Sequence, residues 1–185
     1  MTEKIIDMDE KILLWIQEHM TADFLTPIMK VFTYSLNSGL LPIAITILLV
    51  CFKKTRKIGV LCACAIAATF LIDNIIIKNI VARVRPYEAV EGVSRLIAKQ
   101  RDYSFPSGHS AASFTFATVI FKKCSPKIGV PALVYAALVA FSRMYLGVHY
   151  PSDVLIGAVT GSLFAYIICL IYDKKISKAK TLNKE

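Results

Sequence analysis

Long apolar runs that alternate with short clusters of basic residues dominate this sequence. Ile58 to Val84 and Pro151 to Tyr172 are each long enough to cross the hydrocarbon core of a bilayer, which takes about 20 helical residues. Backbone N–H and C=O groups find no water inside a bilayer, so such runs must be helical. With a hydrophobic content of 56%, the 185 residues carry too little polar surface for a soluble domain. The sequence therefore predicts an all-α integral membrane protein.

The apolar runs predict six transmembrane helices packed into one bundle over residues 23–185, with a basic tail at 173–185. The first two runs are short and are separated only by Asn37 and Ser38, so they form either two short spans or one long broken span. The six expected spans are Phe24 to Leu36, Gly39 to Phe52, Ile58 to Val84, Ser107 to Lys122, Ile128 to Met144 and Pro151 to Tyr172.

Residues 1–22 have the pattern of an amphipathic helix. Apolar side chains recur at spacings of three and four residues, and acidic and other polar residues fill the remaining positions. Such a helix lies on the membrane surface or packs against neighbouring protein. The apolar positions are Ile5, Met8, Ile12, Trp15, Ile16 and Met20.

The basic residues that give the net charge of +9 are distributed like the signals that set membrane topology, and not like the basic surface of a nucleic-acid-binding protein. Basic clusters at 53–57, 122–127 and in the tail separate the apolar runs, so the positive-inside rule places them in the cytoplasm. We therefore expect a multi-pass protein of the cytoplasmic membrane that contacts the lipid bilayer and does not bind nucleic acid. Six spans would leave both termini cytoplasmic and put segments 78–86, 106–109 and 142–153 on the extracytoplasmic face.

Segment 142–153 combines an arginine, a histidine and an aspartate between two apolar runs. Pro151 suits the first turn of a helix, which leaves Asp153 in that turn and His149 just before it. The carboxylate could accept a hydrogen bond from one imidazole nitrogen and leave the other nitrogen as a nucleophile or base. The alternative is an ordinary polar loop that contains a histidine.

Two further segments indicate a bound anion. On a helix, Lys78 and Arg85 would lie nearly two turns apart on one face, where two cations repel each other unless an anion lies between them. The alternative is that Asp73 neutralises Lys78 or Lys30. Ser107 and Gly108 open the next helix, whose free N–H groups would suit a phosphate, although capped helix starts are common.

Together these segments form a three-part pattern: Lys78-x6-Arg85-Pro86, Pro106-Ser107-Gly108-His109 and Ser142-Arg143-x5-His149-x3-Asp153. The pattern resembles the signature of the type 2 phosphatidic acid phosphatase superfamily, which includes membrane lipid phosphatases, soluble acid phosphatases and vanadate-dependent haloperoxidases. Every fixed position is present, and the resemblance covers the chain from about residue 58 to its end. It implies that Lys78, Arg85 and Arg143 bind phosphoryl oxygens, while Ser107 and Gly108 add a hydroxyl and a backbone N–H.

The resemblance also implies the catalytic groups. His149, oriented by Asp153, would attack phosphorus to form a phosphohistidine, and His109 would protonate the departing oxygen and then activate water. The acids of the 87–105 loop lack metal-ligand spacing, so we expect no metal and no cofactor. These residues would form a metal-independent phosphoric ester or anhydride hydrolase.

The expected substrate is a lipid phosphate or diphosphate. Undecaprenyl diphosphate comes first, because outer-facing chemistry on a small six-span protein resembles that of enzymes that recycle this lipid for cell-wall synthesis. Phosphatidate and phosphatidylglycerophosphate are close alternatives, since the phosphate site suits all of them. A haloperoxidase is not expected, because the chain lacks the large soluble domain of those enzymes. A carrier of lipids or anions that kept the fold is the alternative from another class, although it would need only the cations.

Overall fold

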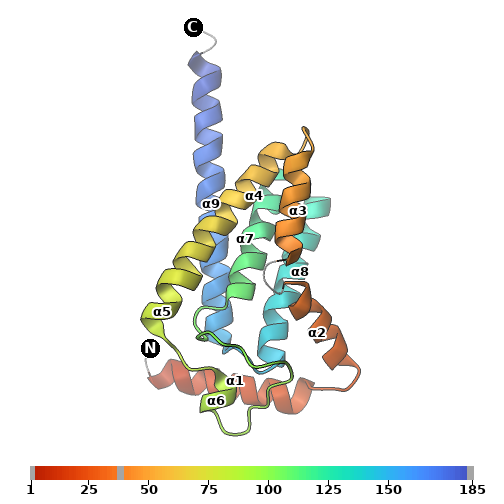
Figure 1. Cartoon of the computed structure of the whole chain (residues 1–185), viewed down its shortest axis with the longest axis vertical. Helices are drawn as coiled ribbons and strands as arrows, with labels where there is room; N and C mark the ends of the chain where they lie inside the picture. The colour runs from red at the N-terminus through yellow and green to blue at the C-terminus, as the bar shows by residue number, and fades with distance from the viewer. Residues whose placement is uncertain (1–2, 37–39, 183–185) are drawn as a thin grey trace.

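The computed structural model describes residues 3–36 and 40–182, and these residues form helices joined by turns and one long loop, without a strand (Figure 1). The all-α prediction is confirmed for the described residues. The elements are α1 (Glu3–Met20), α2 (Leu25–Ser35), α3 (Leu40–Cys51), α4 (Arg56–Thr69), η2 (Phe70–Ile77), α5 (Lys78–Val81), α6 (Pro86–Ala89), α7 (Gly108–Lys123), α8 (Pro126–Tyr145) and α9 (Pro151–Leu182).

Helix α7 lies inside the bundle and packs against α8, α9 and α4 (Figure 1). Glycines allow α9 to approach α7 closely, because a Cβ atom at Gly157 would lie 2.6 Å from the carbonyl oxygen of Ser107, and one at Gly161 would meet that of Ala111. Small residues at such a spacing are common where membrane helices pack. The half of the bundle remote from α1 is held by an apolar cluster from α4, α7 and α9: Leu61, Cys62, Ala65, Val119, Ile120, Ala165 and Cys169.

Three helical stretches are long and apolar enough to cross a membrane: Arg56–Ala89, Pro126–Tyr145 and Pro151–Ala179. A fourth crossing results if α2 and α3, which are bent by 47° relative to each other, form one broken span. Figure 1 shows α2 and α3 in succession along the bundle, one continuing beyond the other. Helix α7 has only 16 residues. Within residues 3–36 and 40–182 there are thus three to four clear candidate spans, and six spans remain a prediction.

Helix α1 lies across one end of the bundle, while the end of α9 projects beyond the other (Figure 1). Leu13 and Ile16 are buried against the bundle, whereas Ile5, Met8, Ile12 and Trp15 are exposed. The expected apolar stripe is therefore divided, with Ile16 packed on protein. The sequence-based topology placed the two ends of the chain on one face of the membrane, and this placement stays a prediction.

A long loop, residues 90–107, crosses the same end of the bundle as α1. Its backbone N–H groups bind carbonyl oxygens of other segments: Leu96 donates to Leu146 at 3.2 Å, and Ser107 donates to Asp153 at 3.0 Å. Gly147, with a φ of +71°, allows the chain to pass the carbonyl oxygen of Ser94, where a Cβ would clash. The loop is thereby fixed over the ends of α8 and α9.

Candidate active site

The three predicted segments converge at the end of the bundle that carries α1 and the loop. A cavity of about 710 Å³ opens there and extends along the bundle toward α3 and α4. Six of the eight predicted site residues line it, while Ser107 and Asp153 are buried beside it. The six lining residues are Lys78, Arg85, Gly108, His109, Arg143 and His149.

Lys78 and Arg85 converge, although not as two positions on one helix. The helix that begins with α4 continues through the π-helical turns of η2 and ends at Val81, because Ala82 adopts a left-handed conformation with a φ of 47°. Arg85 therefore lies on extended backbone just before α6. The two side chains meet at the carboxylate of Asp102, at 2.6 Å from Lys78 Nζ and 2.7 Å from Arg85 Nη2.

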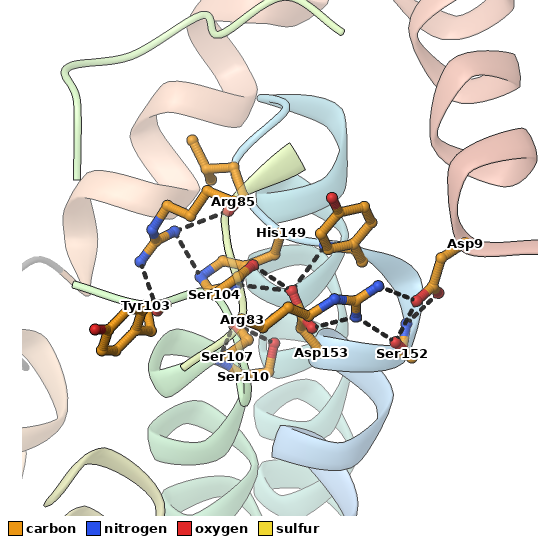
Figure 2. Close-up of polar contacts among 12 residues, drawn as sticks. Asp9, Arg83, Arg85, Tyr103, Ser104, Ser107, Ser110, His149, Ser152 and Asp153 are labelled. Atoms are coloured by element: carbon orange, nitrogen blue, oxygen red, sulfur yellow. Dashed lines mark hydrogen bonds and ion pairs between the residues drawn. The ribbon is translucent and has the colours of Figure 1, made fainter. Parts of the chain in front are cut away.

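Backbone carbonyl groups hold the guanidinium of Arg85. Its Nε donates to the carbonyl oxygen of Asp102 at 2.8 Å, Nη1 to that of Val148 at 2.8 Å and Nη2 to that of Tyr103 at 3.3 Å. Nη1 also lies 3.3 Å from Nε2 of His149 (Figure 2). The 90–107 loop and the α8–α9 connection thus fix this cation beside the imidazole.

Arg143 enters the cavity from the last turn of α8. It is almost completely buried, and its Nη1 donates to the hydroxyl of Thr33 on α2. Its Nε has no hydrogen-bond partner among the described residues. A buried guanidinium with an unused donor that lines a cavity is suited to bind an anion. Asp73, the other buried charged side chain considered from the sequence, accepts from Thr160 at 2.6 Å, and Lys78 pairs with Asp102 instead.

The N-terminus of α7 meets the cavity through Gly108 and His109. Ser107 is the N-cap, and its hydroxyl oxygen accepts from Ser110 N at 3.4 Å. Gly108 lies against η2, where an added Cβ would be 2.5 Å from Oδ1 of Asn74. A side chain at this position would displace Asn74, and the positive end of the helix dipole lies at the cavity end. His109 follows in the first helical turn and lines the cavity.

His149 is buried and lies between Arg85 and Asp153 (Figure 2). Its Nδ1 is 3.5 Å from Asp153 Oδ2, at the outer limit of a hydrogen bond. The same Oδ2 accepts from the Ser104 hydroxyl at 2.5 Å and from Tyr150 N at 2.9 Å. With Nδ1 toward the carboxylate, Nε2 carries the lone pair on the cavity side, beside Nη1 of Arg85.

Burial and neighbouring cations shift the pKa values of two groups here. Burial, followed by the charges of Arg85 and Arg143, holds the pKa of His149 well below its usual value, so the imidazole is neutral at neutral pH. Burial alone would raise the pKa of Asp102, but Lys78 and Arg85 outweigh that effect and hold it below the usual range. The site thus contains a neutral imidazole and an ionised carboxylate between cations.

The structure adds residues that the sequence analysis did not assign to the site. Asp102 lies in a loop without periodicity, and Thr33 belongs to a short apolar run, so no pattern in the sequence assigned either residue to the site. Arg83 did carry a signal, since it is a third cation between Lys78 and Arg85 in a segment that the sequence-based topology places on the face where cations are disfavoured. No group of three or more His, Cys, Asp or Glu side chains among residues 3–36 and 40–182 is arranged to hold a metal ion.

Comparison with known proteins agrees with this arrangement. The family model of the PAP2 superfamily, that of the type 2 phosphatidic acid phosphatases, matches residues 57–177. An undecaprenyl-diphosphatase of Sulfolobus acidocaldarius is 34% identical over 125 residues, which are 68% of this chain and 60% of that protein. Phosphatidylglycerophosphatase B of Bacillus subtilis is 33% identical over 57% of this chain and 53% of its own length. The chain thus spans little more than half the length of these curated relatives.

Two crystal structures share the fold. LpxE of Aquifex aeolicus superposes with a TM-score of 0.77 at 29% identity, over 86% of this chain and 93% of that one. The transmembrane PAP2-type phosphatidylglycerolphosphate phosphatase of Bacillus subtilis gives a TM-score of 0.76 at 28% identity, over 94% and 88% of the two chains. The family match covers more than half of the sequence and includes all three motifs that meet at the cavity. The chain therefore belongs to the PAP2 superfamily.

Proposed function

We propose that this chain is a membrane-embedded phosphatase that hydrolyses the phosphomonoester or diphosphate of a lipid through a phosphohistidine, with undecaprenyl diphosphate as the first candidate substrate. One observation carries the proposal. Nε2 of His149 lies 3.3 Å from the guanidinium of Arg85, at the cationic end of a cavity that Lys78 and Arg143 also line. A phosphoryl group bound by these cations would have the nucleophile beside it.

The remainder of the cavity supports an amphiphilic substrate. Away from the cations it is lined by apolar side chains of α3, α4 and η2, among them Pro42, Ile47, Ala67 and Phe70. Ile47 and Phe70 are also more than half exposed, as side chains in contact with a lipid chain would be. A headgroup at the cations would leave a hydrocarbon chain to follow the apolar side, as a lipid phosphate requires.

The reaction follows from the placement of the two imidazoles. Nε2 of His149 attacks phosphorus, the bond from phosphorus to the leaving oxygen breaks, and His109 gives that oxygen a proton. Asp153 stabilises the charge on the His149 ring, and the cations stabilise the charge that develops on the phosphoryl oxygens. His109 then takes a proton from water, whose oxygen displaces Nε2 and releases phosphate.

The relatives support a lipid substrate without selecting one. An undecaprenyl-diphosphatase, a phosphatidylglycerophosphatase and a lipid A 4'-phosphatase are all similar to this chain. Undecaprenyl diphosphate is first because the Sulfolobus acidocaldarius relative, named for that activity, is 34% identical over 68% of this chain. Phosphatidate and phosphatidylglycerophosphate are the alternatives.

The topology is part of the proposal. Taking α2 and α3 as one broken crossing gives five crossings instead of six, with α4 to α5, α7, α8 and α9 as the others. The basic segments 53–57, 122–127 and 173–182 lie at the end of the bundle opposite to α1 (Figure 1). By the positive-inside rule that end is cytoplasmic, which puts the active site and α1 at the extracytoplasmic face of the cytoplasmic membrane.

A phosphate-release assay tests the function. The purified protein in detergent is given undecaprenyl diphosphate, phosphatidate and phosphatidylglycerophosphate, each with and without EDTA. We expect release that is fastest with undecaprenyl diphosphate and unchanged by EDTA, and none from a folded His149→Ala variant. The absence of release from all three lipids would contradict the proposal and favour a carrier, and wild-type-like turnover by His149→Ala would rule out the nucleophile.

A further inference from the structure

Arg83 joins the Asp153 carboxylate to the N-terminal helix. Its Nη1 donates to Asp153 Oδ1 at 2.7 Å and to the Ser152 hydroxyl at 2.8 Å, and its guanidinium lies 3.6 Å from the centre of the Tyr150 ring. Its Nη2 donates to Oδ2 of Asp9 on α1 at 2.8 Å. Figure 2 shows Arg83 between the two carboxylates, with His149 on the far side of Asp153.

Asp9 is the buried acid of α1. Its side chain is almost fully buried, and its Oδ1 accepts from the backbone N–H of Ser152 at 2.9 Å, in the first turn of α9. The Ser152 hydroxyl donates to its other oxygen. Asp9 thus binds both Arg83 and the start of the helix that carries Asp153, although it is more than 140 residues away in sequence.

The charges of this group explain why Asp9 matters for the imidazole. Arg83 alone would neutralise Asp153, and the carboxylate would then offer His149 no net negative charge. Asp9 supplies the second negative charge, so the group of Asp9, Arg83 and Asp153 keeps a net charge of −1. Buried ionic hydrogen bonds of this kind also fix the side chains that make them.

We propose that Asp9 and Arg83 are positioning residues for the His149–Asp153 pair, which makes the N-terminal helix α1 a part of the reaction machinery. The inference rests on the proposed function, in which His149 carries the phosphoryl group. Asp9 acts through Arg83 and Ser152 and touches neither His149 nor the cavity. Its loss therefore changes the reactivity of the imidazole and leaves the phosphate-binding cations in place.

Other contacts besides those of Asp9 attach α1 to the bundle. Gln17 makes separate contacts to the 90–107 loop, where its side chain donates to Ser94 O at 2.7 Å and accepts from Ser94 N at 2.8 Å. Leu13 is fully buried in a cluster with Val93 and Tyr150. The docking of α1 and the charge of Asp9 can therefore be varied separately.

The test compares Asp9→Asn with two controls on the same helix. Asp7→Asn removes an exposed acid that pairs with Lys11 on the surface, and Gln17→Ala weakens the docking of α1 without reaching Arg83. We expect Asp9→Asn to lower kcat about 10- to 100-fold with KM nearly unchanged, as for other groups that orient a reacting side chain. Asp7→Asn should leave both constants unchanged. Gln17→Ala should lower the melting temperature but reduce kcat less than Asp9→Asn does.

A double-mutant cycle decides between a positioning and a structural role. Because Asp9 acts through Arg83, the Asp9→Asn/Arg83→Gln protein should be no slower than the slower single variant. A wild-type kcat in Asp9→Asn, or losses that multiply in the double variant, would overturn the proposal.

A measurement that needs no turnover separates this inference from the proposed function. The ¹⁵N resonances of His149 report the hydrogen bond of Nδ1, and we expect Asp9→Asn to move them and Asp7→Asn to leave them. Unmoved resonances would overturn the positioning role even in a protein that releases no phosphate. An inactive wild type in which Asp9→Asn moves the resonances would instead contradict only the proposed function.

Discussion

Arg85 makes five contacts with its five guanidinium N–H groups. Three go to backbone carbonyl oxygens, those of Asp102, Tyr103 and Val148, and the other two go to the carboxylate of Asp102 and to Nε2 of His149. The carbonyl contacts hold the group in place. A phosphoryl oxygen can therefore take the two remaining positions, one of which is next to the proposed nucleophile.

The carboxylate of Asp102 occupies the position that a phosphoryl group would need. It bridges Lys78 and Arg85, as a substrate oxygen would, and its side chain is about half exposed, so it can move aside into solvent. Asp102 thus competes with substrate for the same cations. The two anions compete because Lys78 and Arg85 cannot bind the carboxylate and a phosphoryl group at full strength at the same time.

Asp102→Asn should therefore increase the affinity for anions. Without the competing carboxylate, we expect the inhibition constant of inorganic phosphate to fall about tenfold, which corresponds to about 1.4 kcal/mol. Phosphate inhibition of lipid hydrolysis measures it, with Glu91→Gln, an exposed acid of the same loop, as the control. An inhibition constant that is unchanged or higher in Asp102→Asn would show that the carboxylate organises the site instead.

The low pKa of His149 predicts the pH range in which activity is lost on acidification. The free imidazole attacks only when neutral, so a pKa well below about 6.5 keeps the acid limb of kcat/KM below that pH. Arg85 is the largest charge that lowers this pKa. The charged and titratable groups near His149 are Arg85, Lys78, Arg143, Asp102, Asp153 and His109.

Arg85→Gln should move that acid limb to higher pH, because removing the cation lets His149 bind a proton more easily. The pH profile of kcat/KM is compared between wild type and Arg85→Gln with one substrate, so that substrate ionisation is the same in both. A limb that stays in place or moves to lower pH would contradict the assignment of this ionisation to His149.

At the scale of elements, close packing between α7 and α9 sets the distance between two parts of the site. Ser107 begins α7 and Asp153 lies in the first turn of α9, and they are joined by the bond from Ser107 N to Asp153 O. Gly157 and Gly161 leave room for this approach. The π-helical turns of η2 contribute similarly, since they bring Asn74 against Gly108.

Gly161→Ala should therefore separate the two helices. The added methyl group meets the carbonyl oxygen of Ala111 and lies 2.8 Å from the Thr115 hydroxyl oxygen, and overpacking of this kind costs about 1 to 3 kcal/mol. We expect a lower melting temperature in detergent together with a lower kcat. The control is Val159→Leu, which adds volume on an exposed face of α9. Equal melting temperatures for Gly161→Ala and wild type would show that the helices can adjust.

For the whole molecule, the two ends of the bundle should differ in accessibility. In a variant without native cysteines, we expect Lys99→Cys in the loop beside the site to react with an impermeant thiol reagent on intact cells. Lys178→Cys, near the end of α9, should react only after lysis. The opposite pattern would place the active site in the cytoplasm.

Those features of the fold and the site that depend on local sequence pattern could be predicted from the sequence. Apolar run length predicted the helical class, and the fixed spacings identified the residues that the structure brings to one cavity. Contacts between distant segments could not be predicted. Asp9 and Arg83 are 74 positions apart, and nothing in the polar face of the first helix distinguishes Asp9 from Asp7. The relative placement of α2 and α3 could not be predicted for the same reason, because it depends on packing between segments.

The account depends on transfer of a phosphoryl group to His149 within the site that three distant segments form. Trapping that group tests it most directly. A His109→Ala variant lacks both the acid for the leaving oxygen and the base for water. With undecaprenyl diphosphate the leaving group is itself a phosphate and can depart without a proton, so incubation with this substrate labelled with ³²P at the terminal phosphate should leave acid-labile, alkali-stable label on the protein. We predict that peptide mapping finds the label on His149 and that His149→Ala/His109→Ala carries none. Label on another residue, or equal label in the double variant, would contradict the account.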